Sequence, residues 1–361
     1  WVKGEDWVNY SGPYYSSEEY TSAIKILLSE WLIFGKQGRH FENVFPPHLG
    51  QKYGVLTNSG SSANLLMANV FKSKSMAMRK FHMPPGSKFI TPVVCFPTTI
   101  NPLIQAGYEP VFVDVDLPSM NLNLDEVEAE LEKDPSIRAL TFAHVLGNPP
   151  DMDRVMDLVK KYNLNFLEDS CDALGSFYDG KKLGSFGLIS TCSFFPAHHM
   201  TTGEGGFAAT SNLRVRKVLA SIRDWGRACY CNEKKPGDVT AGTACGDRFQ
   251  AWLSDGKNKI CYDHRYVFDE IGFNTKPLDL QAAMGLHQLD KLPEMDAARR
   301  KNFKRMEKSF SKYDDFFMLP KATEKSDPCW FGYALTVKEN DIFDKQELVS
   351  HFEENKVQTR S

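Results

Sequence analysis

The sequence lacks the features of membrane, nucleic-acid-binding and disulfide-rich proteins. No apolar run approaches the roughly 20 residues that a membrane helix requires. Lys and Arg (43) nearly balance Asp and Glu (46), so the net charge of −3 gives no electrostatic reason to expect nucleic acid or an anionic membrane as partner. Eight cysteines in 361 residues are too few for a disulfide scaffold. With no signal peptide, they predict reduced thiols or metal ligands in a cytoplasmic protein.

The length of the chain suits one large domain with a smaller one. We expect an N-terminal helical segment (1–44), a large α/β domain (45–290) and a small C-terminal α+β domain (291–361). The chain starts at Trp1 without a methionine and stops at Ser361 soon after a helical pattern. We therefore expect a fragment whose small domain is cut short.

Strand-like apolar runs alternate with helix-like periodicity over the first two thirds of the chain. This order predicts an α/β fold with a mostly parallel sheet flanked by helices. A long helical pattern follows from 277 to about 310, where Pro293 is expected to break or kink the helix. After it, 331–337 predicts a strand and 345–355 a helix. The predicted strands of the sheet are 88–94, 110–115, 139–145, 165–169, 189–195 and 206–210.

One segment, 229–263, differs from the rest because it is polar, has no periodicity and holds four of the eight cysteines. A loop of this length within a domain is usually functional or disordered.

The segment 53–62 begins as a short strand, continues with small hydroxyl residues around Gly60, and leads into an amphipathic helix. Free N–H groups and the positive end of the helix dipole beside Gly60 and Ser61 suit a phosphate. The alternative is an ordinary helix N-cap made by Ser61 or Ser62.

A second motif, 166–172, is a buried apolar strand that ends in carboxylates. Ligands of open α/β sheets bind at the carboxyl ends of strands, which is where Asp169 lies. A buried carboxylate needs a positive partner, and a protonated pyridine nitrogen would supply one. The alternative is that Asp169 caps the next loop.

A third motif, 193–206, combines two adjacent histidines, His198 and His199, with a glycine-rich turn at another strand end. A neutral imidazole is well matched to proton transfer near pH 7. A hydrogen-bonded structural pair of histidines is the alternative.

The order and spacing of these motifs resemble the sugar aminotransferases of fold type I, vitamin B6 enzymes that act on nucleotide-linked keto sugars. The resemblance runs from about Gly35 to the end of the chain and includes the segments 271–274 and 280–283. It implies that Gly60, Ser61 and Ser193 hold the cofactor phosphate. It also implies that Phe96 stacks on the pyridine ring, that Asp169 pairs with the ring nitrogen, and that Asn274 reaches the phosphate from the other subunit of a homodimer.

One departure from the family pattern bears on the reaction. Six residues before Glu204 the aminotransferases carry the lysine that binds the cofactor covalently, whereas this chain has His198. Imidazole forms no stable imine with the cofactor aldehyde, so a base is kept and the covalent tether is lost. The substitution resembles the deoxysugar 3-dehydrases, which use pyridoxamine phosphate: the cofactor amine condenses with a C4 ketone, the histidine takes a proton, and the C3 hydroxyl leaves. His199 is the alternative base, and His144 either faces the sugar or is a core histidine.

The cysteine spacing resembles that of 3-dehydrases with a [2Fe–2S] cluster, which act on CDP-linked 4-keto-6-deoxyglucose. Fifty-seven residues separate Cys171 from Cys229, and Cys231 follows. The family spacing puts the fourth ligand at position 239, which is a valine here. Cys245 has the family-like surroundings, so we expect a six-residue insertion before it, with Cys261 as the competing ligand. The other cysteines, Cys95, Cys192 and Cys329, are expected to be ordinary buried thiols.

The sequence therefore predicts a pyridoxamine-phosphate- and [2Fe–2S]-dependent 3-dehydrase of a CDP-linked 4-keto-6-deoxyhexose, on a route to 3,6-dideoxy sugars of lipopolysaccharide. Its electrons would come from a separate NADH-dependent flavin and iron–sulfur reductase. One alternative is a cluster-free dehydratase that uses glutamate and pyridoxal phosphate. Another is a non-catalytic protein that binds sugar nucleotides.

Overall fold

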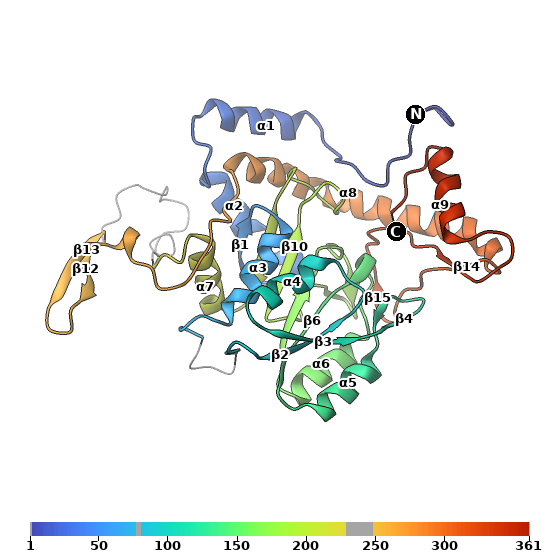
Figure 1. Ribbon diagram of the computed structural model, residues 1–361. Coiled ribbons are helices and arrows are strands. Elements are labelled where there is room, and N and C mark those ends of the chain that lie inside the picture. The colour runs from blue at the N-terminus through green and yellow to red at the C-terminus, as the bar shows by residue number, and fades with distance from the viewer. Residues whose placement is uncertain (1, 77–80, 229–247, 361) are drawn as a thin grey trace.

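A computed structural model describes residues 2–76, 81–228 and 248–360, and its centre is a seven-stranded sheet (Figure 1). Five neighbouring strands run parallel, whereas β11 is antiparallel to both of its neighbours. The predicted mostly parallel sheet is therefore confirmed. In spatial order the strands are β1 (Tyr53–Thr57), β11 (Gly206–Thr210), β10 (Ile189–Ser193), β7 (Asn165–Asp169), β6 (Ile137–Ala143), β2 (Lys88–Pro92) and β3 (Glu109–Val113).

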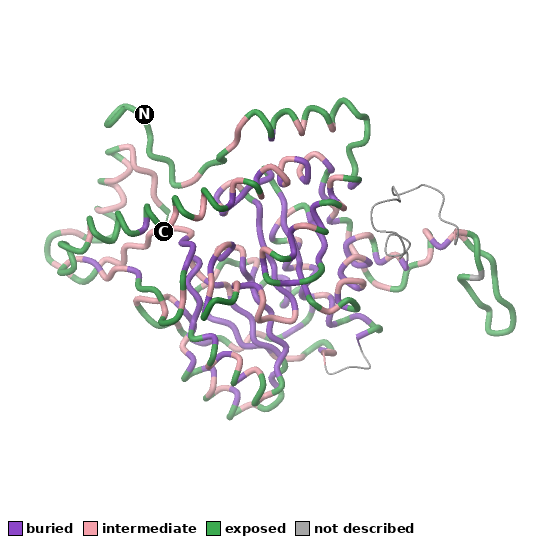
Figure 2. The backbone as a smooth tube through the Cα atoms, turned by 180° about the vertical axis from the view of Figure 1, so that it is seen from behind, coloured by how far each residue is buried: buried purple, intermediate pink, exposed green. Residues whose placement is uncertain are grey.

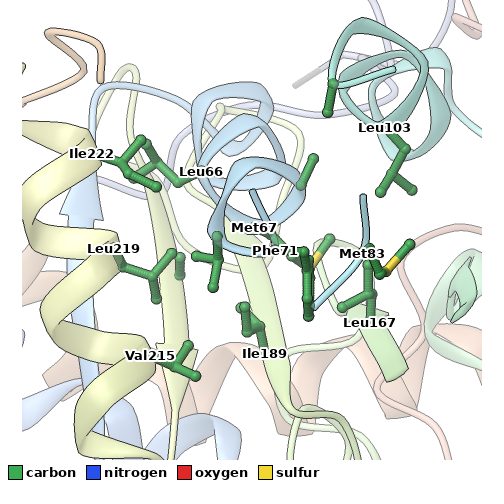
Figure 3. Packing of buried hydrophobic residues seen from close by; sticks show 14 of the residues in the cluster. Leu66, Met67, Phe71, Met83, Leu103, Leu167, Ile189, Val215, Leu219 and Ile222 are labelled. Atoms are coloured by element: carbon green, nitrogen blue, oxygen red, sulfur yellow. The ribbon is translucent and has the colours of Figure 1, made fainter. Parts of the chain in front are cut away.

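Helices cover both faces of the sheet because successive strand residues point to opposite sides. Val55 and Leu56 show the alternation, since the first packs in one hydrophobic cluster and the second in another. The first cluster, drawn in Figure 3, lies under α3 (Gly60–Val70), α4 (Pro97–Gln105) and α7 (Leu213–Arg223). The opposite face is covered by α2 (Lys36–Val44), α5 (Leu124–Lys133), α6 (Met152–Lys161) and α8 (Asp279–Phe310). Figure 2 shows the resulting buried strands inside a shell of exposed helix faces.

The N-terminal helix α1 (Ser17–Leu28) lies along α8 (Figure 1). Glu19 is buried at this contact, where Gln288 Nε2 and Lys291 Nζ each lie 2.6 Å from Glu19 Oε1. At the start of α8, the Asp279 carboxylate accepts the N–H groups of Gly35 and Gly38, both at 2.8 Å. Helix α8 is thus the element to which the chain before the sheet is attached.

Short elements complete the described chain. A hairpin of β12 (Phe249–Ser254) and β13 (Lys259–Asp263) projects from the body (Figure 1). Three short helical turns, Pro46–Leu49, Val145–Gly147 and His264–Tyr266, lie between longer elements, and a fourth, Ser311–Tyr313, follows α8. The remaining elements are β4 (Val115–Asp116), β5 (Asn121–Leu122), β8 (Phe177–Tyr178), β9 (Lys181–Lys182), β14 (Phe317–Met318), β15 (Ser326–Asp327), β16 (Thr336–Val337) and α9 (Lys345–Glu354).

Most predicted strands are present, and 165–169 and 206–210 have the predicted bounds. The strand predicted at 331–337 is wrong except for β16, because the Phe331 carbonyl accepts from Arg299 of α8 and the Phe331 N–H donates to the Leu146 carbonyl, neither of which is in a strand. Pro293 does not break α8, whose residues Leu292 and Met295 pack into a core cluster on either side of it. Helix α8 also continues across position 290, the expected boundary between the large domain and the small one.

The segment 229–263 is also not a loop throughout, because the part of it that is described contains the β12–β13 hairpin. None of the helices in the described part of the chain has the length and apolar character needed to cross a bilayer.

A buried ion pair, Glu42 with Arg223, ties α2 and α7 to β1. Glu42 Oε1 accepts the Leu56 N–H at 2.8 Å, and Arg223 Nη1 donates to Glu42 and, at 2.9 Å, to the Leu56 carbonyl. Both side chains are less than a tenth exposed. Removing one partner of such a pair leaves the other charge buried and uncompensated.

We predict that Glu42→Gln lowers the free energy of unfolding by about 3–5 kcal/mol, measured by urea denaturation. Glu42→Gln combined with Arg223→Met should cost less than the sum of the two single changes, because neither charge is then left alone. Glu128→Gln, which breaks an ion pair with the half-exposed Lys161, is the control and should cost far less. Equal losses for Glu42→Gln and Glu128→Gln would contradict the prediction.

Candidate active site

The carboxylate of Asp169, at the carboxyl end of β7, is buried and held by three neutral donors. Its Oδ2 accepts from Asn64 Nδ2 at 2.9 Å and from Thr99 Oγ1 at 2.8 Å, and its Oδ1 accepts the Cys171 N–H at 3.1 Å. Asn64 is itself oriented by Thr191 Oγ1 at 2.6 Å. All hydrogen-bond partners of Asp169 among the described residues are uncharged. A buried carboxylate in this setting suits a cationic ligand such as a protonated pyridine nitrogen.

The start of α3 forms a concave group of main-chain donors next to this carboxylate. Ser59, and not Ser61 or Ser62 as the alternative prediction had it, is the N-cap: its side chain accepts the Ser62 N–H at 3.1 Å. No hydrogen bond recorded for residues 2–76, 81–228 and 248–360 uses the N–H groups of Gly60 or Ser61. A Cβ on Gly60 would lie 2.6 Å from the Cβ of Ser193, so only glycine brings this backbone so close to the Ser193 hydroxyl. The three predicted phosphate-binding residues therefore lie together.

Phe96 is the N-cap residue of α4 and its side chain is 71% exposed. Three residues later, Thr99 contacts Asp169, so α4 links the exposed ring to the buried carboxylate. An exposed aromatic ring on this edge of the sheet fits the predicted stacking on a pyridine ring. The buried carboxylate of Asp169, the N–H groups at the start of α3 and the exposed Phe96 ring are groups that suit pyridoxal or pyridoxamine phosphate.

His198 lies on the loop after β10, and its side chain is only 16% exposed. Its Nε2 is 3.7 Å from Asp172 Oδ1, its ring centroid is 5.3 Å from that of Phe331, and its Nδ1 has no hydrogen-bond partner in the described chain. Burial lowers the pKa of His198 to about 4, so the imidazole is neutral and able to accept a proton at neutral pH. Burial, together with the charge of Asp169, raises the pKa of Asp172 to about 7.

His198 also lines an open cavity of about 400 Å³. His199, Tyr14, Met295 and Arg299 line it too, whereas Asp169 and the start of α3 do not, so this cavity lies on the α8 side of His198. A buried imidazole at the edge of a cavity can reach a ligand without becoming fully solvated.

The two other candidate histidines have structural partners. His199 is fully buried, its Nε2 donates to the Cys329 carbonyl at 2.6 Å, and burial holds the pKa of its imidazole well below the ordinary value. His144 is also fully buried, with Nε2 2.9 Å from Glu168 Oε1. Glu168 in turn accepts N–H groups from the turn at 184–187. His144 is therefore a core histidine, and His198 is the one of the three whose side chain is partly exposed.

Asn274 is exposed and lies next to Thr275, whose carbonyl accepts the Asn58 N–H at 2.9 Å. The segment 274–275 thus lies beside the loop that leads into α3 of its own chain. The predicted contact of Asn274 with a second subunit stays a prediction.

Of the four predicted cluster ligands, Cys171 is described, whereas Cys229, Cys231 and Cys245 lie outside the described residues. Burial and the charge of Asp169 raise the pKa of the Cys171 thiol, so a thiolate there needs the charge of a metal ion. In the described ranges, no three His, Cys, Asp or Glu side chains are grouped to bind a metal.

The cysteines outside the predicted set include Cys261, which is exposed on β13 and whose Sγ donates to the Phe249 carbonyl at 2.8 Å. Cys192 and Cys329 are buried as expected, and Cys95 is half-buried.

Sequence reasoning missed several residues of this site. Asn64 and Thr99 orient Asp169. Arg299 donates to the His198 carbonyl, and the Phe331 ring packs on the His198 ring. A polar residue inside the apolar pattern of 60–70 was a usable signal for Asn64. Nothing local distinguishes the other three, since their roles depend on the tertiary fold.

The family model described as the DegT/DnrJ/EryC1/StrS aminotransferase family matches residues 13–361. A lipopolysaccharide biosynthesis protein, RfbH of Salmonella typhimurium, is 40% identical over 99% of this chain and 79% of its own length. The dTDP-4-dehydro-2,6-dideoxy-D-glucose 3-dehydratase of Saccharopolyspora spinosa is 39% identical over 99% of this chain and 75% of its own length.

Solved structures agree with this assignment. The GDP-4-keto-6-deoxy-D-mannose 3-dehydratase of Escherichia coli with bound hydrated pyridoxal phosphate superposes with a TM-score of 0.82. It is 27% identical, and the match covers 98% of this chain and 85% of that chain. The fold is therefore that of fold type I B6 enzymes, and its relatives include sugar 3-dehydratases. The chain belongs to the DegT/DnrJ/EryC1/StrS aminotransferase family.

Proposed function

We propose that this protein catalyses the C3 dehydration of a nucleotide-linked 4-keto-6-deoxyhexose, with pyridoxamine phosphate and a [2Fe–2S] cluster. In the overall reaction the C3–O bond breaks and the hydroxyl leaves as water. Two electrons from an NADH-dependent flavin and iron–sulfur reductase, with two protons, leave a methylene group at C3. The product is a 4-keto-3,6-dideoxy sugar, as a route to lipopolysaccharide sugars requires.

The observation that carries this proposal is the state of His198. The site has the carboxylate and phosphate-binding groups of a B6 enzyme, yet the position of the covalent lysine holds a neutral, nearly buried imidazole. An imidazole can accept a proton from carbon and return it to a leaving hydroxyl, but it cannot retain the cofactor as an imine. This combination favours dehydration over amino transfer.

The other residues of the site would bind the cofactor and hold it in position. Bound pyridoxamine phosphate would supply an amine for the ketone and a ring that withdraws electrons. Asp169 keeps the pyridine nitrogen protonated, because a buried carboxylate favours a cation beside it. The N–H groups of Gly60 and Ser61 and the Ser193 hydroxyl bind the phosphate at the positive end of α3. Phe96 covers one face of the ring, and Asn274 of a second copy completes the phosphate site in the proposed homodimer.

The proposal also specifies an iron–sulfur cluster and the nucleotide of the substrate. The spacing of Cys171, Cys229, Cys231 and Cys245 supports the cluster, and the position of Cys171 two residues after Asp169 would bring it near the pyridine ring. A CDP-linked sugar follows from the resemblance to clustered 3-dehydrases. The relatives act on dTDP- and GDP-linked sugars by name, so these are the competing substrates.

A cluster-free dehydratase is the second candidate function. The likeness to a 3-dehydratase solved with hydrated pyridoxal phosphate favours it. In this function glutamate would regenerate the cofactor amine and the cysteines would have no role. The third reading, a non-catalytic sugar-nucleotide-binding protein, predicts that replacing His198 changes nothing.

We predict that His198→Asn lowers kcat for C3 dehydration by at least about 100-fold, because the proton acceptor is lost. Activity is measured on CDP-, dTDP- and GDP-linked 4-keto-6-deoxyhexoses, with the CDP sugar expected to give the highest kcat/KM. Pyridoxamine phosphate affinity, measured by fluorescence titration, should change little. His351→Asn, on the exposed side of α9, is the control and should retain full activity. Retained activity in His198→Asn would refute the role of His198.

We also predict that anaerobically purified protein contains about two irons and two acid-labile sulfides per chain and has a brown visible spectrum. Cys171→Ser and Cys245→Ser should lose this iron, whereas Cys261→Ser should keep it. Loss of iron in Cys261→Ser with retention in Cys245→Ser would assign the fourth ligand to the hairpin. A colourless protein that is fully active with glutamate alone would establish the cluster-free function instead.

The pH behaviour of His198 gives a separate prediction. Because burial lowers its pKa to about 4, the imidazole should stay neutral as the pH falls from 8 to 5 and gain its proton only near pH 4. Carbon-13 NMR of histidine-labelled, cofactor-free protein measures this, and His198→Asn identifies the signal. A midpoint near 6.5, the value of a solvated imidazole, would contradict a buried neutral base.

A further inference from the structure

The side chain of Arg299, on α8, reaches the two segments on either side of the His198 ring. Nη2 donates to the His198 carbonyl at 3.1 Å, and Nη1 donates to the carbonyls of Phe331 at 3.1 Å and Trp330 at 3.3 Å. These partners, main-chain oxygens from separate segments, are all the hydrogen-bond partners recorded for Arg299 in the described chain. A planar guanidinium can bridge three such oxygens at fixed angles, whereas an ammonium group cannot.

The segment that Arg299 holds carries an aromatic ring against the imidazole. The Phe331 ring centroid lies 5.3 Å from that of His198, at an angle of 43°. The same segment is fixed from two other directions. His199 Nε2 donates to the Cys329 carbonyl, and Trp330 stacks on Phe303 of α8 with centroids 4.0 Å apart. The Phe331 ring is therefore held firmly over one side of His198.

The charge of Arg299 acts on His198 in the same direction as burial. Its positive charge disfavours protonation of the imidazole, whereas the charge of Asp169 favours it. The charged and titratable groups that face His198 are Asp172 and Asp169 from the β7 end, Arg299 from α8, and His199 on its own loop. Among these, Arg299 is the one that also bonds to the His198 main chain.

We propose that Arg299 is a positioning residue for His198: it fixes the carbonyl of the histidine and the Phe331 ring beside it, so that the imidazole is held in one orientation. This inference rests on the proposed function, because it assigns a support to the proton acceptor of that reaction. Misplacement of a catalytic group by about 1 Å can cost about 100-fold in rate, so a support of this kind should act on kcat.

Arg299→Lys tests the proposal because it keeps the positive charge and removes the forked geometry. Its matched control is Arg300→Lys on the next residue, whose guanidinium bonds to Asp327 and to the Gly175 carbonyl. We expect Arg299→Lys to lower kcat by about tenfold or more with KM changed less than twofold. Arg300→Lys should leave both constants within twofold of wild type.

A second measurement is independent of activity. In cofactor-free protein, the Cε1–H signal of His198 reports the adjacent Phe331 ring through its ring current. The signal should move or broaden in Arg299→Lys and stay in place in Arg300→Lys. Phe331→Leu, which keeps the carbonyl bonds, should also move it and serves as the second variant should Arg299→Lys fail to fold.

An unchanged His198 signal in Arg299→Lys overturns the inference. A moved signal together with a wild-type kcat also overturns it, because the contact would then be purely structural. Wild-type protein that dehydrates none of the three nucleotide sugars refutes the proposed function instead. The inference is then decided by the His198 signal alone.

Discussion

The arrangement of this site depends on a carboxylate buried at the end of a central strand. Leaving the Asp169 carboxylate without partners away from water would cost several kcal/mol, so its neighbours must supply donors. They come from three directions: Asn64 from α3, Thr99 from α4 and the Cys171 N–H from the turn after β7. Because these donors are fixed by one carboxylate, the start of α3 and the start of α4 are fixed relative to each other. The N–H groups at the start of α3 and the exposed Phe96 ring are thereby held at the same edge of the sheet as Asp169.

The antiparallel strand β11 completes the same edge of the sheet. Strands β7 and β10 are parallel, so both end at the edge where Asp169 and Ser193 lie. Strand β11 runs the opposite way and therefore begins there, at Gly206. A Cβ on Gly206 would lie 2.2 Å from the Ser59 carbonyl oxygen, which means that the glycine-rich turn can return to the sheet only by passing directly against the N-cap of α3. The close approach of the two main chains therefore explains why position 206 is a glycine. This approach also places the loop that carries His198 at the edge of the sheet where Asp169 lies.

The sequence predicts this architecture well where the information is local. The strand at 165–169 is buried along its whole length because both of its faces are covered, and the carboxylates that end it identify Asp169 from the residues alone. The contacts that orient the site are not local: Asn64, Thr99 and Arg299 lie 105, 70 and 101 positions from the residues that they hold. The strand predicted at 331–337 fails for the same reason, since the carbonyls of Trp330 and Phe331 bond to Arg299 and not to a neighbouring strand. Hydrophobic periodicity indicates which face of an element is buried. It does not indicate which distant side chain donates a hydrogen bond to a given main-chain carbonyl.

The two adjacent histidines show why such distant contacts matter for chemistry. Both imidazoles are removed from water and both have lowered pKa values, so their protonation does not distinguish them. Their Nε2 atoms do: His199 gives its Nε2 proton to the Cys329 carbonyl at 2.6 Å, whereas the Nε2 of His198 lies 3.7 Å from Asp172 Oδ1, beyond hydrogen-bond distance. A proton acceptor has to be neutral, fixed and accessible at once, yet hydrogen bonds that fix an imidazole directly also occupy its nitrogens. In this fold, contacts to the main chain and to neighbouring residues restrain the His198 imidazole, rather than hydrogen bonds to its nitrogens. His199 anchors the loop, and Arg299 holds the His198 main chain and the segment of the Phe331 ring, so these contacts restrain His198 without occupying its ring nitrogens.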